Sequence, residues 1–159
     1  MVYHSGILVR RHRPSVIKEL ISNSLTLLDG GYTRSSIIEG VAALELAVGR
    51  FARNPDPAKF NRPNSQRIEW ERLSQTREHL GFSSFFRYVV PIIFSPERLN
   101  DDLLKSASKL IELRQTVVHG GQRSFPDFYI LREYIRDVAR VCLVLIDSTA
   151  EVSTDTAAP

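Results

Sequence analysis

Cysteine is almost absent from this sequence, as are the features that mark secreted and membrane-spanning proteins. The chain has 159 residues and one cysteine, Cys142, so no disulfide can form within it. Cys142 lies in the apolar run 141–146, which predicts a buried, inert thiol rather than a nucleophile. No apolar run approaches the roughly 20 residues of a membrane span, and the N-terminus lacks the order of a secretory signal. These absences predict a cytoplasmic protein with no membrane segment.

Histidine is also scarce, and its four copies, His4, His12, His79 and His119, are scattered along the chain. Structural zinc sites usually take their ligands from cysteine and histidine pairs at short spacing, and this sequence has no such pair. It also has no glycine-rich phosphate loop and no recognisable serine or cysteine nucleophile motif. We therefore expect no metal site and no cofactor.

The remaining composition is that of an ordinary globular protein, with 43% hydrophobic and 25% charged residues. A formal net charge of +3 fits a polyanionic partner without requiring one. We expect three parts: a basic N-terminal arm at 1–13, one helical domain at 14–147 and a disordered tail at 148–159. The tail is expected because it consists mainly of serine, threonine, alanine and acidic residues.

Apolar residues recur at helical spacing through most of the chain, and no segment shows convincing strand alternation. The expected helices cover about 14–29, 35–52, 65–80, a short stretch within 82–94 broken by Pro91, 95 to 114 or slightly beyond, and 127–147. A segment with three prolines, 54–64, is expected to be a loop. The fold class is therefore all-α: a single helical bundle of about five main helices.

Local signals predict where several of these helices begin and end. Thr33 or Ser35 is a plausible cap for the second helix. Ser95-Pro96-Glu97 combines a cap, a first-turn proline and a first-turn acid, and predicts a helix start. Gly120-Gly121 predicts the end of that helix.

One position on the apolar stripe of the helix after residue 95 carries a charge. The stripe passes through Ala107, Leu110 and Ile111, and the next position on that face is Arg114. A guanidinium stays charged in proteins, so it needs a partner or water there. The stripe of the second helix contains an acid, Glu45. We expect these two residues to pair, either to support chemistry at Arg114 or only as a salt bridge at the core edge.

Five residues after Arg114 comes His119, just before two glycines, where a helix end would leave it partly exposed. Imidazole can accept or donate a proton near neutral pH, and guanidinium binds phosphate. Together they suit metal-independent RNA cleavage, in which the ribose 2'-hydroxyl attacks the adjacent phosphorus. One histidine per chain supplies one proton-transfer role, and a symmetric dimer would bring a second. Arg72 and His79 are similarly spaced, but their surroundings are polar helix surface.

The segment Arg114-Gln115-Thr116-Val117-Val118-His119 resembles the Arg-x(4–6)-His motif of the HEPN superfamily, which includes toxin, CRISPR-associated and antiviral ribonucleases. The likeness covers roughly residues 14–147. It implies a homodimer with the motif at its interface, Arg114 on the scissile phosphate and His119 as general acid or base. Glu45 would orient Arg114, and Gln115 stands where the family usually has asparagine. It also implies a prokaryotic defence or toxin–antitoxin setting, with an antitoxin or other protein partner.

Two further alternatives remain open from the sequence. The cluster Arg10, Arg11 and Arg13 is either a grip on the RNA backbone or a solvated arm. Because some HEPN proteins have lost catalysis, the rival to a ribonuclease is a non-catalytic module that binds a partner protein or a nucleotide.

Overall fold

Four long helices carry the fold. The computed structural model describes residues 15–59, 68–120 and 124–150. The long helices are α1 (Val16–Asp29), α2 (Thr33–Arg53), α6 (Asp101–Val118) and α7 (Phe128–Asp147). The described residues contain no β-strand, and none of their helices is both long and apolar enough to cross a bilayer. The predicted all-α bundle is confirmed.

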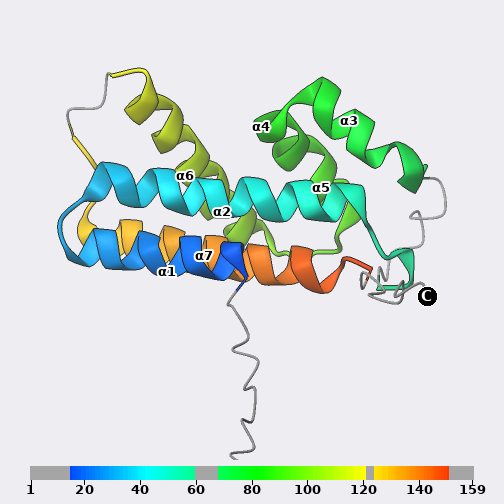
Figure 1. The fold of residues 1–159 in the computed structure, drawn as a ribbon, viewed down its shortest axis with the longest axis horizontal. Helices are drawn as coiled ribbons and strands as arrows, with labels where there is room; N and C mark the ends of the chain where they lie inside the picture. Colours follow the sequence, from blue (N-terminus) through cyan, green and yellow to red (C-terminus); the bar gives the residue numbers. More distant parts are fainter. Residues whose placement is uncertain (1–14, 60–67, 121–123, 151–159) are drawn as a thin grey trace, which may run out of the picture.

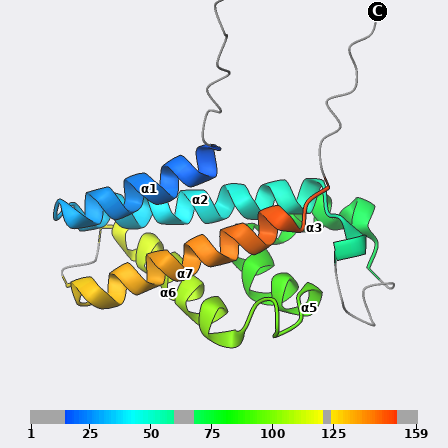
Figure 2. The ribbon, with the colours of Figure 1, turned by 90° about the horizontal axis from the view of Figure 1, so that it is seen from below.

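α2 is the central helix of the bundle. It contacts α1, α6, α7 and α3, the last of which spans Leu73–Leu80. Figure 1 shows α1 and α2 side by side, with the end of α6 and the α3–α5 segment over opposite halves of α2. Figure 2 shows α7 between α1 and the α5–α6 segment. The larger apolar side chains of α2 that are fully buried are Ile37, Val41, Leu44, Val48 and Phe51. Ile38, next to Ile37 in the helix, is exposed.

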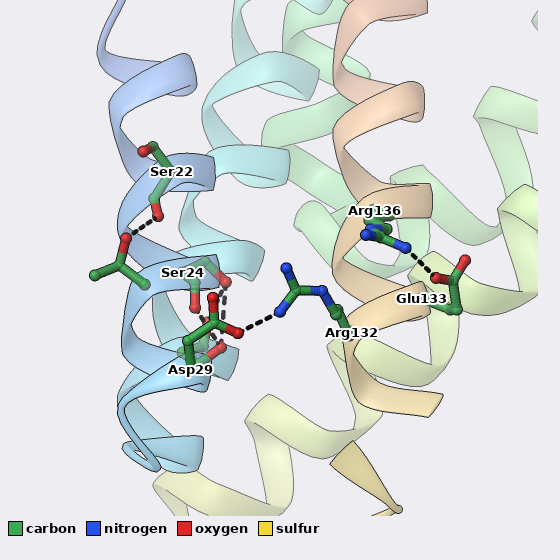
Figure 3. A network of polar contacts seen from close by, with 8 residues as sticks. Ser22, Ser24, Asp29, Arg132, Glu133 and Arg136 are labelled. Carbon is green, nitrogen blue, oxygen red and sulfur yellow. Dashed lines mark hydrogen bonds and ion pairs between the residues drawn. The ribbon is translucent and has the colours of Figure 1, made fainter. Parts of the chain in front are cut away.

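Two serines join α1 to α2 in the interior. The Ser24 hydroxyl donates to the Ser36 carbonyl at 2.8 Å, and the Ser36 hydroxyl donates to the Ser24 carbonyl at 2.8 Å. Both residues are fully buried, and Gly40 lies directly beside Ser24. Figure 3 shows Ser24 at this junction and Arg132 reaching from α7 toward Asp29, with which it forms an ion pair. Small residues therefore let α1 and α2 approach closely while their polar groups stay satisfied.

Two of the predicted helix starts are wrong. α2 begins at Thr33 after Tyr32, and no side chain caps it, so neither Thr33 nor Ser35 has the expected role. The segment Ser95-Pro96-Glu97 forms a turn instead of a helix start. α6 begins six residues after Ser95, because the Asn100 side chain accepts a hydrogen bond from the Leu103 N–H at 2.9 Å.

The region between α2 and α6 also differs from its prediction. α3 begins at Leu73 after a 3-10 turn, η3 (Trp70–Arg72), rather than at 65. The chain then stays helical through α4 (Phe82–Ser84), the π-helical turn η4 (Phe85–Val89) and α5 (Val90–Ile93). Pro91 does not break this helix, because the wider π turn before it has already interrupted the α-helical hydrogen-bond pattern.

The chain after α7 is ordered further than predicted. The Asp56 N–H donates to the Ser148 carbonyl and the Ala150 N–H to the Asn54 carbonyl, each at 2.9 Å. These bonds flank a bridge between Pro55 and Thr149, which joins the segment after α2 to the segment after α7. The prediction that the disordered tail begins at Ser148 is therefore wrong for residues 148–150, and 151–159 lie outside the described residues.

Two glycines of α2 provide a matched test of the α1–α2 contact. A Cβ at Gly40 would lie 3.1 Å from Ser24 Oγ, which its hydrogen bonds hold in place, whereas a Cβ at Gly49 would meet Arg77 at an ordinary 3.7 Å. We expect Gly40→Ala to lower the free energy of unfolding by about 1–3 kcal/mol through overpacking. Gly49→Ala should raise it by up to about 1 kcal/mol, because alanine favours helix. Urea unfolding followed by circular dichroism measures both, and equal stabilisation by the two changes would contradict the contact.

Candidate active site

The end of α6 presents His119 to solvent. His119 is the C-cap of the helix, and its backbone N–H donates to the Gln115 carbonyl at 3.1 Å. The next residue, Gly120, has φ +79°, a left-handed conformation that glycine adopts without strain. The chain thus leaves the helix immediately after His119, whose side chain is exposed.

Arg114 lies one turn beyond the buried part of α6. Ala107, Leu110 and Ile111 are buried, and Arg114 follows them on the same face with its side chain partly buried. Among the described residues, no hydrogen bond or ion pair reaches its guanidinium. The partly exposed guanidinium can still meet water, and a charge that interrupts an apolar stripe is a feature found often at functional sites.

Glu45 does not pair with Arg114, and that expectation is wrong. Its Oε1 instead lies 3.7 Å from Nη2 of Arg77 on α3. The reason is the direction of α6: Leu110 packs against α2 at Gly40, and from there α6 runs toward the beginning of α2 (Figure 1). Glu45 lies five residues beyond Gly40 toward the opposite end of α2, so the two side chains diverge.

The motif residues of one chain do not share a face of α6. Positions five apart in an α-helix are separated by roughly 140° around the axis, so Arg114 and His119 project on different sides. Gln115, four residues before His119, lies on the side of α4, and its Nε2 donates to Ser83 Oγ at 3.4 Å. A single chain therefore carries an exposed imidazole and a partly buried guanidinium that project on different sides of α6.

A second pair with similar spacing, Arg72 and His79, lies on the surface. Arg72 forms an exposed ion pair with Glu69 at 3.0 Å, and His79 is exposed near the end of α3. The predicted RNA-binding residues, Arg10, Arg11 and Arg13, lie outside the described residues. Within the described ranges, no three histidine, cysteine or acidic side chains gather closely enough to hold a metal ion.

Exposed apolar side chains lie at the end of α6 and elsewhere at the same end of the molecule, a feature that the sequence patterns did not reveal. Val118 is 58% exposed beside His119, and the first turn of α7 exposes Phe128, Tyr129 and Ile130. Tyr32, in the turn between α1 and α2, is also exposed. Figure 1 places these three segments at one end of the molecule. Only a three-dimensional arrangement assembles this surface, because its members lie far apart in the sequence.

Cys142 is buried, and this burial raises the pKa of its thiol to about 12. The thiol therefore stays protonated in the folded chain and is a poor nucleophile. We expect iodoacetamide to modify the urea-unfolded chain many-fold faster than the native chain at mildly alkaline pH. Since the thiol in the unfolded chain ionises first, its contribution to stability should fall as the pH rises from about 9 to about 12. Rapid alkylation of the native chain would contradict the burial of Cys142.

Replacing Arg114 tests whether this arginine contributes to the stability of the fold. Because Arg114 continues the buried stripe without a partner among the described residues, Arg114→Met should raise the free energy of unfolding by roughly 0.5–2 kcal/mol. The matched change Arg132→Met should lower it, since it leaves Asp29 without its ion pair. Chemical unfolding of both variants measures the contrast. A large loss of stability in Arg114→Met would show that the arginine is structural.

Comparisons with known proteins do not place the chain in a family. No protein-family model matches it, and neither a curated protein nor a solved structure matches it significantly. The functional assignment therefore depends on the residues at the end of α6 and on their geometry.

Proposed function

We propose that this protein is a metal-independent endoribonuclease of the HEPN type. The proposal depends on one observation at the end of α6. The exposed His119 follows a partly buried arginine, Arg114, that has no partner among the described residues. Arg114 occupies a position where the apolar stripe favours a hydrophobic side chain, so folding does not explain its charge. Binding of an RNA phosphate would explain it, because guanidinium binds phosphate oxygens through paired hydrogen bonds.

The proposed reaction is attack of a ribose 2'-hydroxyl on the adjacent phosphorus. A histidine acting as general base removes the hydroxyl proton, and a protonated histidine gives a proton to the departing 5' oxygen. Arg114 stabilises the negative charge that develops on the phosphorane. The products carry 2',3'-cyclic phosphate and 5'-hydroxyl ends. Gln115 supports the site through its contact with Ser83, and Glu45 has no role in it.

A homodimer would complete the site. Each chain offers one histidine at the end of α6, while the reaction needs both a base and an acid. A twofold axis near Val118 would bring two copies of His119 and Arg114 together. The exposed apolar side chains at this end of the molecule support such a contact, since aromatic residues are enriched in protein interfaces.

The biological setting follows from the same resemblance. A ribonuclease of this type would act in prokaryotic defence or as the toxin of a toxin–antitoxin pair, with an antitoxin or another protein as regulator. The substrate is RNA, and the basic cluster Arg10, Arg11 and Arg13 would grip its backbone.

A non-catalytic binding module is the alternative. The divergence of Arg114 and His119 within one chain favours it, as does glutamine in place of the usual asparagine at position 115. In that case the same end of the molecule would bind a partner protein or a nucleotide without chemistry.

Replacing His119 tests the proposal. The chain is incubated with labelled RNA in EDTA, beside His119→Ala and the matched control His79→Ala, which removes another exposed histidine. We expect His119→Ala to slow cleavage by about 10²–10⁴-fold, as for loss of a general acid or base, and His79→Ala to leave the rate unchanged. Fold and dimer state are checked by circular dichroism and light scattering.

Mixing experiments test the composite site. If His119 of each chain serves one shared site, excess His119→Ala protein should inhibit the wild type by forming mixed dimers. No RNA cleavage by the folded wild-type dimer would favour the binding module. Equal cleavage by the wild type and His119→Ala would place the activity elsewhere.

A further inference from the structure

The structure places Glu45 in a second site, away from the end of α6. A surface pocket of about 370 Å³ lies between α2 and α3, on the half of α2 that Figure 1 shows beneath α3. Its lining residues are Ala42, Glu45, Leu46, Gly49, Arg53 and Arg77. The first five come from successive turns of α2, with Glu45 and Leu46 adjacent on one turn, and Arg77 reaches across from α3.

The two arginines of this pocket donate no hydrogen bond to any described residue. Arg77 is only 26% exposed, and its Nε is buried with no hydrogen-bond partner in the described part of the chain. Its 3.7 Å distance to Glu45 is an ion pair but too long for a hydrogen bond. Arg53 is exposed and has no ion pair within the described ranges. Because Nη2 of Arg77 makes no hydrogen bond to Glu45, the terminal nitrogens of this guanidinium can donate to an anionic ligand in the pocket.

Glu45 places a negative charge in the same pocket as the two arginines, so the ligand must also suit a carboxylate. Its carboxylate accepts no hydrogen bond from the described residues and lines the same pocket, so it favours a ligand that also carries N–H donors. Ala42 and Leu46 supply an apolar wall beside it. A suitable ligand therefore combines an oxyanion, a donor edge and a flat apolar body.

We propose that this pocket binds a guanine mononucleotide. The phosphate would accept hydrogen bonds from Arg77 and Arg53, and the base would lie against Ala42 and Leu46. The guanine N1–H and N2 amino group would donate together to the two oxygens of Glu45. Adenine and cytosine instead place an acceptor nitrogen beside their amino group, which a carboxylate repels. The volume is within the range of small-ligand pockets, roughly 300–1,000 Å³.

This site goes beyond the proposed ribonuclease and does not depend on it. Arg114 and His119 lie at the end of α6, which runs toward the beginning of α2, whereas the pocket lies over its second half (Figure 1). Binding of the nucleotide can therefore be measured whether or not the chain cleaves RNA.

Calorimetric titration of the full chain with 5'-GMP tests the proposal, beside AMP, CMP, UMP and inorganic phosphate. We expect GMP to bind at least about ten-fold more tightly than the other nucleotides, as a bidentate carboxylate contact discriminates between bases. Glu45→Gln should abolish this preference, while Arg77→Gln should weaken all nucleotides about ten-fold or more. Arg72→Gln, which changes an exposed arginine before α3, is the matched control and should leave binding unchanged.

Additional variants and ligands show which features of the pocket and of the nucleotide are required. Arg77→Lys keeps the charge but loses the planar fork, and it replaces Arg77→Gln should that variant unfold. His119→Ala should bind GMP like the wild type, so failure of the ribonuclease proposal leaves this test intact. A guanine-containing oligonucleotide that binds when GMP does not would overturn the mononucleotide assignment. Equal binding of all nucleotides, or unchanged binding by Arg77→Gln and Arg77→Lys, would overturn the site.

Discussion

Two buried serines hold α1 against α2, and the long helices α6 and α7 pack on the pair that they form. Each hydroxyl of Ser24 and Ser36 donates to the other residue's carbonyl, so two polar side chains are buried without an unsatisfied donor. Gly40 leaves room beside them for Leu110 of α6 and Ile135 of α7. The close approach of the first two helices therefore also determines where α6 and α7 enter the core.

The direction of α6 across α2 decides which charged groups meet. Once Leu110 is seated at Gly40, the remaining turns of α6 run away from Glu45. Arg114 is therefore partly buried without an acidic partner among the described residues, and Glu45 forms an ion pair with Arg77 instead. The same crossing thus separates two groups of charged residues, one proposed to cleave RNA and the other to bind a nucleotide.

Each proposed site contains an arginine that lacks a hydrogen-bond acceptor among the described residues. Arg114 lacks an acceptor within the described ranges, and the buried Nε of Arg77 lacks one too. The buried Nε of Arg77 reduces stability, and Arg114 interrupts an apolar stripe, so folding alone does not explain either arginine. Val118 at the end of α6 and Tyr129 in the first turn of α7 are exposed and add apolar surface, which suits a second chain better than water.

Local patterns were enough to predict the four long helices, though not all of their first residues, and the exposed position of His119. The stripe from Ala107 to Arg114 and the glycine after His119 depend only on helical periodicity and on backbone preferences within a few residues. The partner of Glu45, the passage of the helix through Pro91 and the ordered Ser148–Ala150 segment were not predictable in this way. Each depends on helix crossings and on contacts between distant segments, and only the packed tertiary structure determines which of these contacts form.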